Sequence, residues 1–267
     1  MSCPLSEVTD VLQARAPLEW AEPWDNVGLL VQPAVVDITS ILLTIDLTES
    51  VFAEAQAHQA NLIIAYHPVI FSGLKRLTRT SANERIVIDA IRAGIAIYSP
   101  HTALDAAPGG MNDWLVQAFG KGKVTPIVGL ANAPLGAGLG RLVELDAPKS
   151  LDELLPVIRQ HLGLSQLRVA AATQHANGAP IRSAAVCAGA GGSVFQQCPV
   201  VDLLLTGEMR HHDILSRVAA GTSVVLADHT NTERGYLAQL AMHLREALGL
   251  DVAVHVSSND REPLKIC

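Results

Sequence analysis

Apolar residues along the chain alternate between short, strand-like runs and longer segments with helical spacing. The strand-like runs are residues 38–46, 61–67, 95–99, 139–146, 167–173, 182–189, 201–208, 223–229 and 251–257. Helical patterns separate several of these runs, which is typical of βαβ units with a mainly parallel or mixed sheet. The pattern therefore predicts an α/β fold whose mixed sheets are flanked by helices.

Local signals mark where several helices begin. Thr48 is expected to cap the helix that follows the first strand, because a threonine oxygen satisfies backbone N–H groups there. Ser81 with Glu84, and Ser150 with Glu153, have the spacing of a capping box. These signals predict helices over residues 84–94 and 150–163.

Residues 126–140 interrupt the alternation. They are rich in glycine, proline and alanine and show no periodicity, which indicates a connection between lobes. We predict a first lobe over residues 1–128 and a second lobe that begins at residue 129.

Composition and charge exclude several function classes. The formal net charge is −7, and no basic run is longer than Lys75-Arg76, which argues against binding to nucleic acid through phosphate neutralisation. Neither a membrane span nor a signal peptide is recognisable, so we expect a cytoplasmic protein with no membrane partner. The four cysteines contain no C-x-x-C pair, and any metal site must therefore use histidines and carboxylates.

Polar residues follow the ends of several predicted strands. His67, His101, Asp105, Glu208 and His229 all occupy such positions. In open α/β sheets this edge binds ligands, because its loops project side chains from rigid strands. A shared site is therefore plausible on geometric grounds.

His229 and Glu233 lie four residues apart at the start of a predicted helix, so both can project from one face. With His67 and Asp105 they form a mixed nitrogen and oxygen ligand set. Such a set suits zinc, manganese, iron or nickel, which the sequence does not distinguish. The alternative is that the pair only stabilises a helix N-terminus and that Asp105 opens a turn.

Two further segments are candidates for chemistry. Glu208 is followed by His211 and His212, and a histidine there could transfer protons near neutral pH; alternatively, adjacent histidines point to different helical faces. The glycine-rich residues 187–194 could cradle a phosphate but are more often only a tight turn. Near the N-terminus, Trp24 and Asp25 indicate a turn with a packed aromatic side chain.

Five motifs resemble one known family in their order along the chain. They are WDNVGLLV, YHPVIF, SPHTALDAAPGGMNDWL, LLLTGEMRHHD and HTNTERGYL, and they resemble the GTP cyclohydrolase I type 2 homologues, also called NIF-three-like proteins. The resemblance implies a two-lobed subunit in a homo-hexamer, with a dinuclear metal site in the cleft between the lobes. It also implies that residues 129–228 form the second lobe and that 229–267 return to the first.

The resemblance assigns the metal ligands to His67, Asp105, His229 and Glu233. One departure concerns Tyr66, which stands where bacterial members commonly have a second histidine and which resembles the eukaryotic-type branch. The chain could therefore hold one divalent ion or two. The second ion could bind more weakly, or Tyr66, His101 or a water could replace the missing ligand.

We expect a metal-dependent hydrolase of a small-molecule substrate, a nucleotide or a related heterocycle, with GTP cyclohydrolase as the activity that the resemblance implies. His101, Glu208 and His211 are the expected catalytic residues, which would move protons. The alternative is a non-enzymatic metal-binding scaffold or regulator that engages a protein partner.

Overall fold

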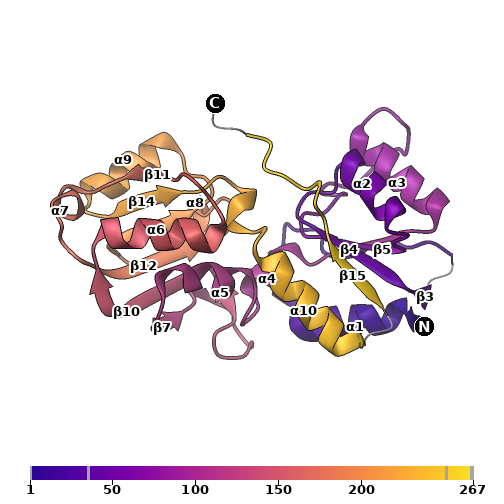
Figure 1. The fold of residues 1–267 in the computed structure, drawn as a ribbon, viewed down its shortest axis with the longest axis horizontal. Helices are drawn as coiled ribbons and strands as arrows, with labels where there is room; N and C mark the ends of the chain where they lie inside the picture. The colour runs from indigo at the N-terminus through magenta and orange to yellow at the C-terminus, as the bar shows by residue number, and fades with distance from the viewer. Residues whose placement is uncertain (1, 35–36, 250–251, 265–267) are drawn as a thin grey trace. The chain divides into compact units, whose positions relative to one another are not determined.

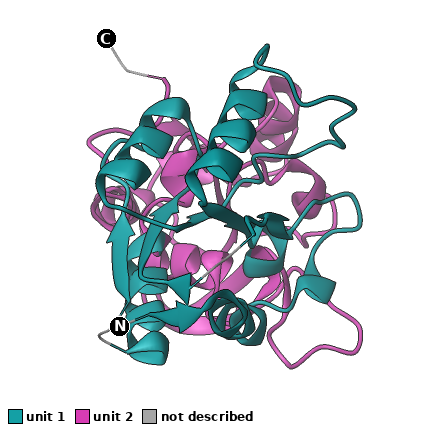
Figure 2. Cartoon of the chain, turned by 90° about the vertical axis from the view of Figure 1, so that its right-hand side faces the viewer, with its two compact units in different colours: residues 1–104, 237–261 teal, residues 105–236, 262–267 magenta. Residues whose placement is uncertain are grey.

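The computed structural model of the chain describes residues 2–34, 37–249 and 252–264. Two compact units divide it: residues 1–104 with 237–261, and residues 105–236 with the C-terminal residues from Glu262 (Figure 2). Each unit carries its own main sheet, so the predicted mixed α/β fold is confirmed. No helix in the described part of the chain is long and apolar enough to cross a membrane.

The first unit is built on a sheet of mostly parallel strands. Its order, among the described residues, is β15-β4-β5-β6-β2, and only β2 runs antiparallel to its neighbour. The strands are β2 (Gly28–Val31), β4 (Ser40–Thr44), β5 (Leu62–Ala65), β6 (Ala96–Ser99) and β15 (Ala253–Val256). The residues of β4, β5 and β6 are buried without alternation, as expected for parallel strands covered on both faces.

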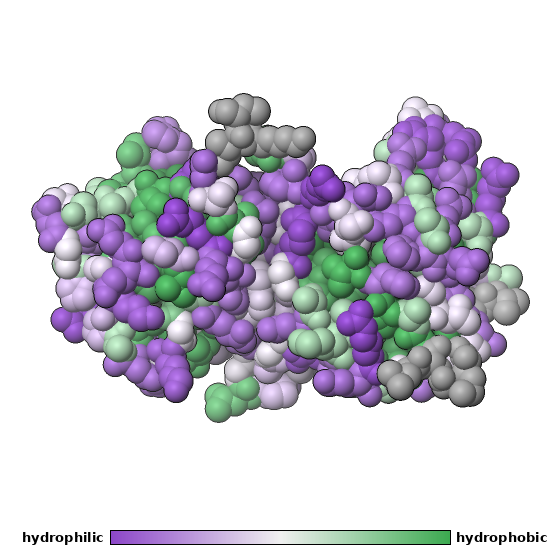
Figure 3. Space-filling view, in the orientation of Figure 1, coloured by the Kyte–Doolittle hydropathy of each residue, from purple (hydrophilic) through white to green (hydrophobic). Residues whose placement is uncertain are grey.

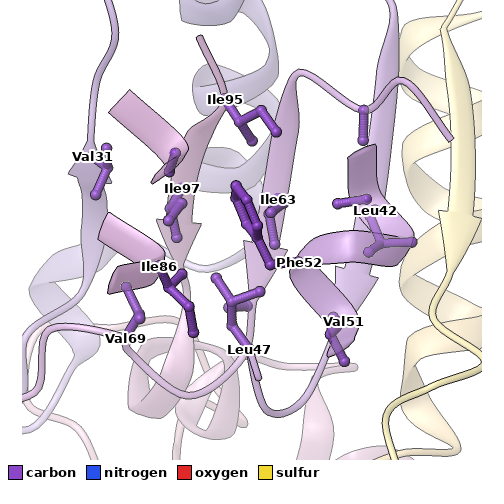
Figure 4. Packing of buried hydrophobic residues seen from close by; sticks show 14 of the residues in the cluster. Val31, Leu42, Leu47, Val51, Phe52, Ile63, Val69, Ile86, Ile95 and Ile97 are labelled. Carbon is purple, nitrogen blue, oxygen red and sulfur yellow. The ribbon is translucent and has the colours of Figure 1, made fainter. Parts of the chain in front are cut away.

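Two helices, α2 (Glu49–Ala57) and α3 (Ala82–Ala93), lie side by side in this unit (Figure 1). Figure 4 shows Phe52 of α2 and Ile86 of α3 packed with Ile63 and Ile97 of the strands. The predicted caps are confirmed, because Thr48 and Ser81 accept hydrogen bonds from the first turns of these helices. The remaining described elements of the unit are β1 (Cys3–Pro4), α1 (Leu5–Arg15), η1 (Leu18–Trp20), β3 (Asp37–Ile38), α4 (His101–Ala106) and α10 (Tyr236–Leu248). The division between the two units falls within α4 and at the start of α10.

The second unit is built on a mixed sheet of order β11-β14-β13-β12-β10-β7 in the described residues. Its strands are β7 (Gly122–Thr125), β10 (Arg141–Lys149), β11 (Arg168–Ala170), β12 (Ile181–Cys187), β13 (Leu203–Thr206) and β14 (Ser223–Leu226). The three central strands β12, β13 and β14 are parallel, and the others are antiparallel to their neighbours. The parallel strands therefore bring the loops after Cys187, Thr206 and Leu226 to one edge of the sheet.

The helices of the second unit are short, apart from α6 (Leu151–Leu162), which begins with the predicted capping box of Ser150 and Glu153. The other elements are α5 (Met111–Val116), η2 (Gln117–Phe119), β8 (Val128–Gly129), β9 (Gly138–Leu139), α7 (Thr173–Ala176), α8 (Gly192–Phe195), α9 (His211–Ala219) and η3 (Thr230–Thr232). Phe195 of α8 and Ile214 of α9 pack on Ala185, Leu204 and Val224 of the sheet. Helices α8 and α9 therefore cover one face of this sheet, close to the loops that follow its parallel strands.

The observed division differs from the predicted lobe boundaries at residues 128 and 228. Residues 105–128 belong to the second unit, because β7 pairs with β10 in its sheet. At the other end, His229 and Glu233 stay with the second unit, and the chain returns to the first only from Leu237.

A buried arginine ties the second unit together. Arg141 is 1% exposed, its guanidinium contacts the Asp113 carboxylate at 2.6 and 3.1 Å, and it donates to the carbonyls of Ala107, Gly138 and Gly140. A charge buried in this way is tolerated because every N–H of the guanidinium meets an acceptor.

Polar residues make up most of the surface on the face of the molecule that Figure 3 shows.

Candidate metal centre

His229 and Glu233 lie at the two ends of η3, in the loop after β14. The sequence predicted that both sit at the start of one α-helix, but α10 begins only at Tyr236, and the two residues flank a 3₁₀ turn. They still meet: His229 Nε2 is 3.5 Å from Glu233 Oε1. Glu233 is 2% exposed, whereas about a third of the His229 side chain is accessible.

This separation fits two ligands of one ion. Nitrogen and oxygen ligands at about 2.0–2.1 Å from a tetrahedral zinc-type ion stand roughly 3.4 Å apart. His229 and Glu233 belong to a group of histidine and carboxylate side chains that could hold a metal ion. The same separation also fits a direct contact between the imidazole and the carboxylate.

A glycine allows the neighbouring loop to pass directly against this pair. Gly189 follows β12 in a left-handed conformation with φ of +61°. A side chain here would place its Cβ 2.6 Å from His229 Nε2 and 2.8 Å from Glu233 Oε1. The Gly189 N–H donates to Thr232 Oγ1 of η3 at 2.8 Å, and its carbonyl accepts from Glu208 N. The glycine-rich loop thus packs against the His229–Glu233 pair.

Three charged groups of the second unit act on the buried Cys187 thiol: Asp105, Glu233 and Arg141. Burial raises the pKa of the Cys187 thiol, and the charges of Asp105 and Glu233 raise it further. Both carboxylates therefore lie close enough to Cys187 to act on its thiol. Asp105 has its backbone fixed by Asn112, which donates to the Asp105 carbonyl and accepts from the N–H of Ala188 in the glycine-rich loop.

Glu208 follows β13 and approaches the other side of the His229 ring. Its Oε1 lies 3.4 Å from His229 Nδ1, and its side chain is 57% exposed. A carboxylate beside Nδ1 favours the tautomer that leaves Nε2 as the ligand atom. His211 and His212 begin α9 with exposed rings that contact each other, 5.4 Å between centroids.

In the first unit, His67 follows β5 and contacts an aspartate that the sequence did not single out. Asp46 follows the neighbouring parallel strand β4, and its Oδ1 lies 2.9 Å from His67 Nδ1. Metal-binding histidines commonly contact a carboxylate through the ring nitrogen that does not bind the ion. With Nδ1 in contact with Asp46, Nε2 is the ring nitrogen that His67 would offer to an ion.

His101 forms a second histidine–aspartate pair in the same unit. Its Nδ1 lies 2.8 Å from Oδ1 of Asp25, whose side chain is fully buried and also accepts from the N–H and hydroxyl of Thr102. Burial alone would raise the pKa of Asp25, but the hydrogen bonds from His101 and Thr102 outweigh it and lower the pKa. The aspartate of the N-terminal turn thus orients His101. Trp24 in that turn is 58% exposed, but its ring packs against those of Phe71 and His101, with centroids 5.9 and 6.0 Å away.

Comparisons with known proteins agree on one family. The family model described as "Duf34/NIF3 (NGG1p interacting factor 3)" matches residues 3–263. The chain belongs to the Duf34/NIF3 family. It is 41% identical to NIF3-like protein 1 of Drosophila melanogaster over 97% of this chain and 88% of that protein. It is 38% identical to NGG1-interacting factor 3 of Saccharomyces cerevisiae over 91% and 90%.

Solved structures support the Duf34/NIF3 fold. A Bacillus cereus protein related to NIF3 superposes with a TM-score of 0.86 at 20% identity and full coverage of both chains. Reduced HcgD from Methanocaldococcus jannaschii gives a TM-score of 0.81 at 23% identity, over 97% of this chain and 99% of that one. At these identities the likeness shows the fold alone.

Tyr66 is the position at which the resemblance described above implies a departure from a second histidine. The residue is 2% exposed, and its ring contacts those of His67 and His101, with centroids 5.1 and 5.4 Å away. Its carbonyl accepts a hydrogen bond from the Ser99 hydroxyl. The Tyr66 ring therefore packs beside both His67 and His101, the two histidines that aspartates hold in place.

Sequence reasoning missed the contacts of four residues around this candidate site, although it had named Asp25 in the N-terminal turn and the glycine-rich residues 187–194. Asp46 and Asp25 orient histidines, Asn112 fixes the Asp105 backbone, and Gly189 packs against the ligand pair. Asp46 could have been suspected from its place just after a buried strand. Asp25 and Asn112 have partners 76 residues away, His101 and Ala188, and His229 is 40 residues from Gly189, so no local signal identifies these contacts.

Proposed function

We propose that this protein binds a divalent metal and acts as a metal-dependent hydrolase on a nucleotide or related heterocycle, as a GTP cyclohydrolase would. The observation that carries the proposal is the His229–Glu233 pair, with the buried carboxylate oxygen 3.5 Å from the imidazole nitrogen. A metal ion bound there supplies a Lewis acid and lowers the pKa of a bound water. Zinc, manganese, iron and nickel all suit this donor set.

The proposed ligands are His67, Asp105, His229 and Glu233. Asp46 holds His67 so that Nε2 is its ligand atom, and Glu208 favours the same tautomer of His229. These two carboxylates support the proposal, because they make both histidines better electron donors to a cation. Whether one ion or two are held depends on Tyr66 and its surroundings.

His101 is the proposed group for proton transfer, together with Glu208 and His211. The buried Asp25 carboxylate contacts Nδ1 of His101 and fixes the orientation of its ring, as proton transfer to and from a substrate requires. Glu208 is exposed and could act on substrate as well as on His229. His211 has no described contact with these groups, and its role rests on the sequence alone.

Metal content per subunit tests the proposal. Protein purified without chelator is analysed for the wild type, His229→Ala, Glu233→Gln and Tyr66→His, with the exposed His212→Ala as the matched control. We expect one or two ions in the wild type and in His212→Ala, and a loss in His229→Ala and Glu233→Gln. Metal-free wild type would refute the metal site, and full turnover of GTP by a metal-free Glu233→Gln would refute the mechanism.

A scaffold that engages a protein partner is the second candidate, favoured by the name of the yeast relative, NGG1-interacting factor 3. It predicts metal-loaded protein that turns over nothing in a broad nucleotide and phosphoester panel but binds one purified partner with fixed stoichiometry. The homo-hexamer also stays a prediction, and light scattering of the purified chain tests it.

A further inference from the structure

The segment that follows β15 is held in place by a buried carboxylate of the first unit. Glu54 of α2 is 8% exposed and accepts four hydrogen bonds from this segment. Their donors are the hydroxyls of Ser257 and Ser258 and the N–H groups of Ser258 and Asn259. The Ser257 hydroxyl also accepts from the N–H of Asp260. The backbone therefore has a fixed path from the end of β15 to Asp260 (yellow in Figure 1).

Asp260 binds the chain next to His67 and its partner Asp46. Asp260 is 5% exposed, and its Oδ2 accepts a hydrogen bond of 2.6 Å from the N–H of Ile45, just after β4. Ile45 is fully buried, so its N–H has no access to water and depends on this acceptor. The Ile45 carbonyl accepts from the N–H of His67 at 3.0 Å, and Ile45 directly precedes Asp46. Asp260 therefore fixes the backbone on which the His67–Asp46 contact depends.

Glu262 makes a similar contact in the second unit. Its Oε2 accepts from the N–H and the hydroxyl of Thr230, at 3.3 and 2.8 Å. Thr230 is 4% exposed and directly follows His229, and its carbonyl accepts from the N–H of Glu233 at 3.1 Å. Arg234 donates to the Thr230 hydroxyl oxygen at 2.9 Å, which directs the hydroxyl hydrogen to Glu262. Thr230 thus connects Glu262 to both residues of the His229–Glu233 pair.

We propose that Asp260 and Glu262 are positioning residues of the metal centre, Asp260 for His67 and Glu262 for His229 and Glu233. The inference rests on the proposed metal site. Neither carboxylate is a proposed ligand. Each accepts a backbone N–H beside a ligand, and so restricts that ligand to one direction, as the fixed geometry of a metal site requires. Two residues of one short segment thereby support separate parts of the ligand set.

Binding of Co²⁺ to the full chain tests this role. Competition with a chelator of known affinity gives the affinity, and the visible spectrum of bound Co²⁺ reports the geometry of its ligands. Asp260→Ala and Glu262→Ala should each lower the affinity by about tenfold and change the spectrum, the lower end of the effect of supporting groups because both act through the backbone. Asp260→Asn and Glu262→Gln keep an oxygen that accepts the same N–H, so both should bind Co²⁺ nearly as the wild type does.

Arg261→Ala is the matched control, because it removes a long side chain from the same segment. Arg261 is exposed and makes no hydrogen bond or ion pair within residues 2–34, 37–249 and 252–264. Its affinity and spectrum should equal those of the wild type. Urea unfolding of each variant after chelator treatment shows that it is folded and measures any loss of stability separately from metal binding.

A double-mutant cycle identifies the ligand through which each residue acts. In His67→Ala protein, Asp260→Ala should cause no further loss of Co²⁺ affinity, whereas Glu262→Ala should still lower it by about tenfold. A merely structural role would lower the affinity equally with and without His67. That equal loss would overturn the role of Asp260.

Wild-type affinity and spectrum in folded Glu262→Ala would likewise overturn the inference. Glu262 is only partly buried, so this variant decides the question even where Asp260→Ala does not fold. The proposed function fails in a different way. Wild type that binds no Co²⁺ refutes the metal site and this inference together, whereas Co²⁺-loaded wild type that never turns over GTP refutes the hydrolase alone.

Discussion

Replacing Gly189 with alanine tests whether the glycine-rich loop shapes the metal centre. The new methyl group would lie 2.6 Å from His229 Nε2 and 2.8 Å from Glu233 Oε1, and ordinary contacts begin at 3.4 Å. The two atoms must therefore retreat by about 0.8 and 0.6 Å, several times the tolerance of roughly 0.2 Å for a metal–ligand distance. We expect affinity for the metal to fall by at least about tenfold, as when a metal site loses its supporting contacts.

The same substitution also strains the backbone. Gly189 has φ of +61°, where alanine costs about 1–2 kcal/mol. Urea unfolding of chelator-treated protein measures this cost without the metal, and competition with a chelator of known affinity measures the metal binding of folded protein. The two measurements separate a damaged ligand pair from a destabilised fold.

Gly192→Ala is the matched control, because it lies in the same loop, has no positive φ and adds a Cβ in open space. It should keep both the stability and the metal affinity of the wild type. A Gly189→Ala protein that binds metal as tightly as Gly192→Ala would refute the reasoning, because it would show that His229 and Glu233 do not hold the ion in the arrangement seen here.

Three further predictions concern residues that the sequence did not single out. Asp46→Asn should weaken metal binding by roughly 10–100-fold with little change in stability, because it removes the carboxylate beside His67. Chelator competition measures the metal affinity and urea unfolding measures the stability. An unchanged metal affinity would contradict the proposal that Asp46 supports His67 as a ligand. Burial raises the pKa of Glu54, but hydrogen bonds from Ser257 and its neighbours outweigh it and lower the pKa to about 2. Because the folded-state pKa is depressed, Glu54 contributes stability above about pH 4.5 that is lost as pH falls toward 2. The free energy of unfolding of Glu54→Gln, measured in urea, should therefore change less with pH in that window than that of the wild type. Arg141→Met should destabilise the second unit by about 3 kcal/mol, because its carboxylate partner and three carbonyls lose their donors; a change below about 1 kcal/mol in urea unfolding would contradict this.

The sequence predicted the strands and helices well where periodicity was strong. Residues 38–46 and 61–67 contain β4 and β5, and the capping box at Ser150 marks the start of α6 as predicted. These elements follow from local rules, since burial pattern and capping are readable within a few residues. Local rules failed at His229, because the helix predicted there is a 3₁₀ turn. Thr232 of this turn accepts a hydrogen bond from the N–H of Gly189, a contact that the local sequence does not reveal.

The sequence by itself determined the fold class, the family and the types of residue available for a metal. It also placed Glu208 and His229 at strand ends, since strand ends can be read from the apolar pattern. Only the tertiary structure decided that Asp25 orients His101 and that Gly189 packs against His229. These contacts join residues that are 76 and 40 positions apart in the chain. Chain folding creates such contacts, and the sequence near either partner carries no sign of them.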